Sequence, residues 1–473
     1  MSALRLLPAL CALVFAAAAA QAQVPAAELQ YVQSSCSITP REFNRWFESG
    51  SVSKGGEVTF ADGLDFNADP SACDFYQWAH QMFLWVTSPT AGGIVLDSPV
   101  FFDVNFDSSG NAEYIANGAD AKGNQFDLRG SKPVGFQPGG QAGGSDTVLS
   151  LNGSLIYFGV HANDVYAWFN TAVSNGVIAA TAPFPTTQAE LSAVLAYASQ
   201  NGTNLTDGNA LTLELKSAWV DAATVADLSN YITISAAVPN YVKTSTTQWT
   251  IDPKTPSVVK TLAMVGLHVV GPVAGHPEMV WATFEHQRNA PNNTFYFNSI
   301  FSQGAEIPYN SSGTWNFMTD GGPQAGALEP QMTVASDGSI QAVAGKTIAQ
   351  NNVYRVNPWG SPPTPASADN NSELISLNLD IGIMLALAQD VRANYFQLGA
   401  VWSKDGSIPA SGTDPDLAGS VLLANSTMET YHQVAPPGCF GCHASTTSTG
   451  TSHLFSASNN PLVPKAAPAA GAR

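Results

Sequence analysis

The stretch "LTLELKSAWV", residues 211–220, decides the fold class. Its polar side chains at Thr212, Glu214 and Lys216 alternate with leucines. A period of two places polar side chains on one face of a β-strand and apolar side chains on the other. The stretch therefore predicts a strand of an antiparallel sheet.

The text on both sides of this strand has the same character. From about residue 92 to 355, runs rich in β-branched and aromatic residues alternate with clusters of Gly, Asn, Asp and Ser. Such runs at short spacing indicate a sandwich or a distorted barrel. Helical patterns occur at residues 39–47, 71–87, 186–200 and 371–391. The predicted fold class is α+β, predominantly antiparallel β (a sandwich or distorted barrel), with peripheral and buried helices and a separate C-terminal tail.

The first residues have the features of a secretory signal. Residues 1–22 contain one Arg, an apolar run and the small-residue sequence Ala-Gln-Ala before the expected cleavage point after Ala22. The run is short for a membrane anchor, and no charged stop-transfer segment follows it. We therefore expect a periplasmic or secreted protein with no membrane span.

The stretch "CFGCH", residues 439–443, has the spacing that attaches haem covalently. In such a motif both thiols add to the porphyrin and the histidine binds the iron. The alternatives are a zinc site, a thioredoxin-like redox pair, a plain disulfide and coincidence. Zinc would need a fourth ligand at a recognisable spacing, and a redox pair should open a helix in a βαβ unit. We expect one haem c, attached to Cys439 and Cys442, with His443 as the proximal iron ligand.

The remaining cysteines predict one disulfide. Free thiols do not persist in an oxidising compartment, so each cysteine of the exported protein should be bonded. Cys11 belongs to the signal, and the haem motif uses two others. Cys36 and Cys73 are then left to pair with each other.

The sixth position of the iron decides what such a haem can do. A side chain in that position leaves electron transfer, whereas an open position also lets the iron bind a small ligand. His453 is the first choice of distal ligand, because a ten-residue loop from His443 can reach around the haem edge. His286, His268 and Met428 are the alternatives.

Composition limits the partners. The chain has 18 Lys and Arg residues against 36 Asp and Glu residues, a formal net charge of −18. An acidic surface repels nucleic acid, so we expect no nucleic-acid partner. It would suit a basic redox partner protein.

Several stretches, taken together with the haem motif, resemble a family of exported bacterial proteins described as cytochrome c family proteins. These stretches are "DFYQWAHQMFLWVTSP" (74–89), "LHVVGPVAGHPEMVWATFEHQRNAP" (267–291) and "LLANSTMETYHQ" (422–433). The resemblance runs through most of the chain after the signal. It implies Cys439 and Cys442 as thioether attachments and His443 as the iron ligand, and it adds no catalytic residue.

The expected organisation is a signal peptide at 1–22, a β-rich body with N-terminal helices at 23–404, and a linker with the c-type haem segment at 405–473. The expected function is that of an exported monohaem c-type cytochrome carrying single electrons. The alternatives are a haem enzyme of peroxidase or oxygenase type with an open iron site, and a binding or assembly module in which the haem is structural.

Overall fold

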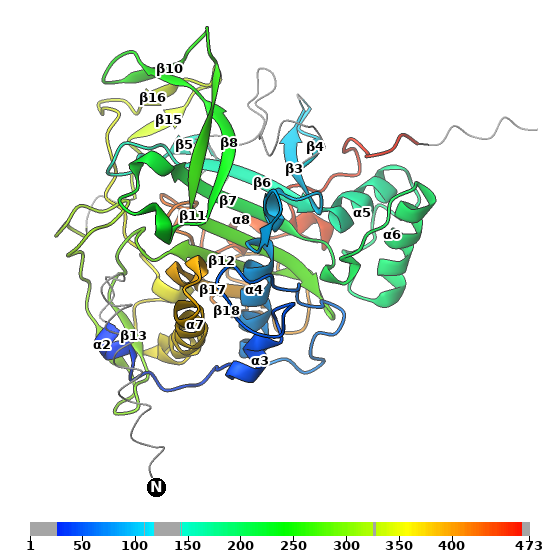
Figure 1. The fold of residues 1–473 in the computed structure, drawn as a ribbon, viewed down its shortest axis with the longest axis horizontal. Coiled ribbons are helices and arrows are strands. Elements are labelled where there is room, and N and C mark those ends of the chain that lie inside the picture. The colour runs from blue at the N-terminus through cyan, green and yellow to red at the C-terminus, as the bar shows by residue number, and fades with distance from the viewer. Residues whose placement is uncertain (1–25, 108, 118–141, 143, 325–327, 466–473) are drawn as a thin grey trace, which may run out of the picture.

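The predicted alternating strand is β7, Glu214–Asp221, near the middle of a nine-stranded sheet (Figure 1). The computed structural model describes residues 26–107, 109–117, 142, 144–324 and 328–465. The predicted signal peptide lies outside them. β7 begins at Glu214 rather than at Leu211, whose φ of 60° interrupts the extended chain. The predicted fold class is confirmed: α+β with mainly antiparallel sheets.

All pairings in the large sheet are antiparallel. In spatial order its strands are β18 (Leu417–Gly419), β17 (Tyr395–Ser403), β12 (His276–His286), β11 (Ser257–Val273), β7, β6 (Tyr157–Asn163), β3 (Phe101–Phe106) and β4 (Ala112–Ala116), and β8 (Thr233–Pro239) pairs with the first half of β11.

The described residues also form three smaller sheets. The five-stranded sheet lies beyond the long hairpin arm of β8 and β11, at the top of Figure 1. Its strands, in order, are β5 (Asp146–Thr147), β15 (Met332–Val334), β16 (Ile340–Ala342), β10 (Gln248–Ile251) and β9 (Tyr241–Lys243). The two-stranded sheets pair β1 (Pro89–Thr90) with β2 (Gly93–Ile94), and β13 (Phe295–Phe297) with β14 (Ala305–Ile307).

Helices pack on one face of the large sheet and past its end, and a short helix of the C-terminal segment packs on the other face (Figure 1). They are α2 (Ala26–Leu29), α3 (Pro40–Asn44), α4 (Ala72–Val86), α5 (Asp164–Ser174), α6 (Gln188–Gln200), α7 (Ala368–Leu387) and α8 (Phe440–His443). The ring of Phe83 in α4 stacks on that of Phe284 in β12 with their centroids 4.4 Å apart. The apolar stripe predicted for α4 is buried against the sheet, as expected for a core helix. Among the described residues, no helix has the length and apolarity needed to cross a bilayer.

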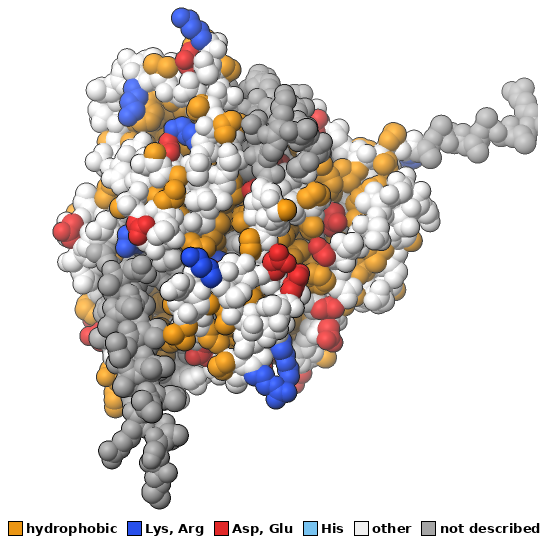
Figure 2. All heavy atoms as spheres, in the orientation of Figure 1, with side chains coloured by type: hydrophobic (Ala, Val, Ile, Leu, Met, Phe, Trp, Pro, Cys, Tyr) orange, Lys and Arg blue, Asp and Glu red, His pale blue; other side chains and the backbone are white. Residues whose placement is uncertain are grey.

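The surface carries little charge. Charged residues make up 11% of the chain, and Figure 2 shows them scattered singly or in small groups among uncharged side chains on the face drawn. Helix α7 is less completely covered than its all-round apolar sequence predicts. Leu387 at its C-terminal end is 60% exposed, because the helix runs past the edge of its packing partners there.

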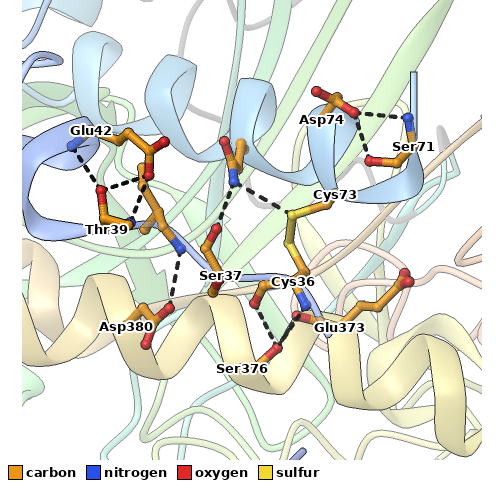
Figure 3. Close-up of a disulfide and its surroundings, with 12 residues drawn as sticks. Cys36, Ser37, Thr39, Glu42, Ser71, Cys73, Asp74, Glu373, Ser376 and Asp380 are labelled. Carbon is orange, nitrogen blue, oxygen red and sulfur yellow. Dashed lines mark hydrogen bonds between the residues drawn. A yellow bond between two sulfur atoms is a disulfide. The ribbon is translucent and has the colours of Figure 1, made fainter. Parts of the chain in front are cut away.

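The predicted disulfide Cys36–Cys73 is confirmed, with the two Cα atoms 5.3 Å apart (Figure 3). It joins the segment that leads into α3 to the first turn of α4. The same segment is bound to α7, because the hydroxyl of Ser376 donates to the carbonyl oxygen of Cys36 at 2.7 Å. Asp380 of α7 accepts a hydrogen bond from the backbone N–H of Ile38 at 3.1 Å.

Removing this disulfide should lower the free energy of unfolding. The bond spans 37 residues, and closing a loop of that length is worth about 4 kcal/mol in the chain-entropy model. We expect the Cys36→Ala/Cys73→Ala variant to have a free energy of unfolding lower by that amount, seen as a lower urea midpoint, with a somewhat steeper slope because its unfolded chain is less compact. The wild type in reductant should behave like the variant. Alkylation of Cys36 or Cys73 in the unreduced, folded protein would contradict the pairing.

Candidate functional site

The C-terminal segment lies on the face of the large sheet opposite α4 and α7. Strand β12 shows this by alternation: Phe284 packs on α4, whereas Trp281 contacts the segment. The ring centroid of Trp281 is 5.7 Å from that of Phe440 and 4.2 Å from that of His443. The CFGCH motif is therefore seated on the central strands of the body.

The motif forms one helical turn. The backbone N–H groups of Cys442 and His443 donate to the carbonyl oxygen of Cys439 at 3.1 and 3.0 Å. Both cysteines are free thiols; that of Cys439 is partly buried and that of Cys442 is exposed. Burial raises the pKa of each thiol above its ordinary value, so both are protonated at neutral pH.

A cavity of about 590 Å³ lies between the motif and the sheet. Its size is that of a pocket for a cofactor or other small molecule. From the sheet it is lined by residues that include Val104, Val160, Glu214, Lys216, His268, Val270, Trp281 and Thr283. From the C-terminal segment it is lined by residues that include Leu423, Glu429, His432, Cys439, Cys442, His443, His453 and Leu454. All three residues of the haem motif thus border one cavity.

His443 is held in the tautomer that an iron ligand needs. Its Nδ1–H donates to the carbonyl oxygen of Thr451 at 2.9 Å, and a carbonyl oxygen can only accept. The proton is therefore on Nδ1, and Nε2 has a free lone pair. Burial, followed by the neighbouring His453, lowers the pKa of His443 to about 3, so the ring is neutral at physiological pH.

The structure places His453 beside His443, not across the cavity from it. The two rings stack with centroids 4.0 Å apart and an interplanar angle of 21°. Nε2–H of His453 donates to the carbonyl oxygen of Cys442 at 3.3 Å. In this arrangement the two rings leave no space between them for a porphyrin, so a distal role for His453 would need its ring to move.

The other predicted distal ligands are separated by the fold. His268 lines the cavity, but His286 and Met428 do not appear among its described lining residues. His286 stacks on Tyr231 with centroids 3.9 Å apart, and Met428 is fully buried in an apolar cluster. Successive side chains on a strand point to opposite faces. His286 therefore points away from the cavity that Trp281 and Thr283 of the same strand line.

Two charged cavity residues were not singled out from the sequence as site residues. Lys216 of β7 and Glu429 of the C-terminal segment both line the cavity. The polar face predicted for residues 211–220 thus faces the cavity, not solvent, and Glu214 on that face is 7% exposed. A charged residue on a strand whose two faces are both covered would have indicated a site here. The sequence alone does not show that the strand is covered, because the covering segment lies about two hundred residues away in the chain.

A buried ion pair anchors the C-terminal segment. Glu285 is fully buried and pairs with Arg355 at 2.8 Å, not with nearby Arg288. The hydroxyl of Ser426 donates to the same carboxylate at 2.6 Å. Glu285 and His286 are adjacent in the sequence, but strand alternation sends their side chains to opposite faces of the sheet, so they do not act on one site.

The loop between His443 and His453 is largely packed against the body. Ser448, Thr449, Thr451 and Ser452 are buried. The hydroxyl of Ser452 bonds to Glu214 and, at 2.7 Å, to the hydroxyl of Tyr166. Buried hydroxyl groups with partners order a segment whose composition alone indicates a loop.

Asp103, His161 and Ser217 form a second polar group, with the spacing of a Ser-His-Asp catalytic triad. It is buried in the sheet, where no substrate can reach it. His161 lies 2.8 Å from Asp103 through Nδ1 and 2.9 Å from the hydroxyl of Ser217 through Nε2. Ser217 has no exposed surface and alternates with Lys216, so its side chain faces the core and not the cavity. We interpret this group as a satisfied polar network within the sheet.

Among the described residues, no cluster of three or more His, Cys, Asp or Glu side chains could hold a metal ion. A c-type haem does not need such a cluster, because the porphyrin supplies four ligands to the iron. No family model matches the chain, and neither the curated proteins nor the solved structures contain a match.

Proposed function

We propose that this protein is an exported monohaem c-type cytochrome that transfers single electrons. The haem would be attached to Cys439 and Cys442, with His443 as the proximal iron ligand. One observation carries the proposal: both thiols and the His443 imidazole border the same cavity of about 590 Å³.

The residues of the cavity fit a haem. The two thiols lie on one helical turn and are free to react, and the tautomer of His443 leaves Nε2 available for iron. Apolar walls from Val104, Val160, Val270 and Leu454 suit the porphyrin ring. When bound, the haem supplies a one-electron redox centre, and burial and axial ligands set its potential.

Electron transfer is supported by exposure at one edge of the cavity. Cys442 is exposed, so the porphyrin edge bonded to it would lie near the surface, where a redox partner can approach. Acidic residues outnumber basic ones, giving a formal net charge of −18, and such a surface would favour a basic partner. A haem enzyme remains the second candidate, because His268 and Glu429 form a polar pair in the same cavity.

The first test is covalent haem in the wild type. We expect the protein, exported from cells with a cytochrome c maturation system, to stain for haem on a denaturing gel and to keep its haem in acidified acetone. The reason is that thioether bonds survive unfolding, whereas coordination alone does not. A fully matured preparation that gives no stained band would overturn the proposal.

A further inference from the structure

His268 occupies the cavity wall next to the expected iron ligand. It lies on β11, opposite Thr283 of β12 in the antiparallel register. Trp281, two residues before Thr283 and on the same face, contacts the ring of His443. His268 and His443 therefore border the same cavity, His268 from the sheet and His443 from the helical turn that packs on Trp281.

A chain of hydrogen bonds determines where the proton of His268 lies. The side-chain amide of Asn425 donates to the carbonyl oxygen of Phe284 at 3.1 Å, which fixes the orientation of the amide. Its nitrogen also donates to the hydroxyl oxygen of Thr283 at 2.8 Å. The hydroxyl proton of Thr283 then goes to Nδ1 of His268 at 2.8 Å, because the carbonyl oxygen of Leu267 is farther, at 3.4 Å. Nδ1 is thus an acceptor and Nε2 carries the proton.

The opposite side of the ring leads to the same conclusion. Nε2 of His268 lies 3.0 Å from Oε1 of Glu429. Burial by itself would raise the pKa of Glu429, but the hydrogen bond from His268, the charge of Lys216 and the backbone N–H of Asn425 are among the causes that lower it to about 2. An ionised carboxylate only accepts hydrogen bonds, so Nε2 must donate. His268 is therefore unlike His443, whose Nε2 has a free lone pair.

We infer that the sixth position of the haem iron is open to a small external ligand, and that His268 serves as the hydrogen-bond donor to that ligand and not as an iron ligand. The inference rests on the proposed function. His453 stacks on His443, Nε2 of His268 is protonated, and His286 and Met428 are absent from the described lining of the cavity. His432 does line the cavity, and a variant below tests it. The ligand class is small molecules whose bound atoms accept a hydrogen bond, such as peroxide, cyanide or carbon monoxide.

Positioning of the donor is built into the fold. Glu429 also accepts from the backbone N–H of Asn425 at 2.8 Å, so both ends of the His268 ring are tied to the same short segment. A bound ligand would compete with Glu429 for the Nε2 proton. Thr283 keeps the ring in the orientation that presents this proton to the cavity.

The test uses the full exported protein with its haem attached. We expect the reduced wild type to bind carbon monoxide and the oxidised wild type to bind cyanide, both seen as a shift of the Soret band. His268→Leu should raise the C–O stretching frequency and weaken cyanide binding roughly fivefold to tenfold, the effect of losing one hydrogen bond. Thr283→Val should change both quantities in the same direction by less.

Two further variants test the donor role of His268 and the open position. His268→Gln supplies an amide N–H in place of the ring N–H and should restore most of the shift and affinity. His432 also lines the cavity, so His432→Ala is made as well: carbon monoxide binding gained only in this variant would make His432 the sixth ligand and overturn the open position. A His268→Leu protein with wild-type carbon monoxide frequency and cyanide affinity would refute the role of His268.

The open sixth position has its own contradicting result. A reduced wild type that stays low-spin and does not bind carbon monoxide has an internal ligand, which overturns the inference. Carbon monoxide binding gained only in His453→Ala would then assign the ligand to His453, as the loop length suggests. Absence of covalent haem is a different outcome, because it removes the proposed function itself and is seen on the denaturing gel before any ligand is added.

Discussion

The Cys439→Ser/Cys442→Ser variant is expected to contain no covalently bound haem. Each single variant should keep one thioether bond and hence a stained band on a denaturing gel, with an altered haemochrome spectrum because one vinyl group remains unsaturated. The physical reason is that the two thiols lie on one helical turn at the same cavity, where both can reach one porphyrin.

The matched control removes the other two cysteines. Cys36→Ala/Cys73→Ala takes away the same number of sulfur atoms but leaves the cavity intact, because the disulfide lies at α3 and α4 on the opposite face of the sheet (Figure 3). This variant should be less stable yet retain covalent haem. A double serine variant that stains as strongly as the wild type would mean that the attachment sites are elsewhere.

Arg355→Met is expected to lower the free energy of unfolding by about 3–5 kcal/mol, the usual effect of leaving one buried charge unpaired. Both side chains of the pair are buried, and Arg355 is the cation bound to Glu285. Because Ser426 is bonded to the same carboxylate, the segment from Asn425 to Gln433 should loosen as well. Urea unfolding followed by tryptophan fluorescence measures the first effect, and hydrogen exchange of the segment measures the second.

The control is an ion pair at the surface. Lys346 and Glu329 are 3.2 Å apart, but the Glu329 side chain is 78% exposed. Lys346→Met should therefore change the free energy of unfolding by no more than about 1 kcal/mol. Replacing both members of the buried pair, as Arg355→Met/Glu285→Met, should recover part of the loss, since no charge is then left unpaired. If Arg355→Met and Lys346→Met lowered the free energy of unfolding equally, the assignment of Glu285–Arg355 as the anchor would be contradicted.

The sequence by itself determined those features that depend on short spacing. Alternation in residues 211–220 indicates a strand because a strand has a period of two. Thr39 with Glu42, and Ser71 with Asp74, predict helix starts because a capping box is completed within four residues. The disulfide followed from counting, because few cysteines were available to pair. The haem motif is likewise read from five consecutive residues, although its cofactor stays a prediction.

Only the tertiary structure decided what those elements face and bind. Glu285 pairs with Arg355, seventy residues away, and not with Arg288. The polar side of β7 borders a cavity because a C-terminal segment covers it, and the proton of His268 is placed by Asn425. These outcomes depend on strand register and on contacts between distant segments. A shift of one residue in the register would turn every side chain of a strand to the other face. The alternation within one strand shows that it has two faces, but which face a distant segment covers depends on contacts that no short stretch contains.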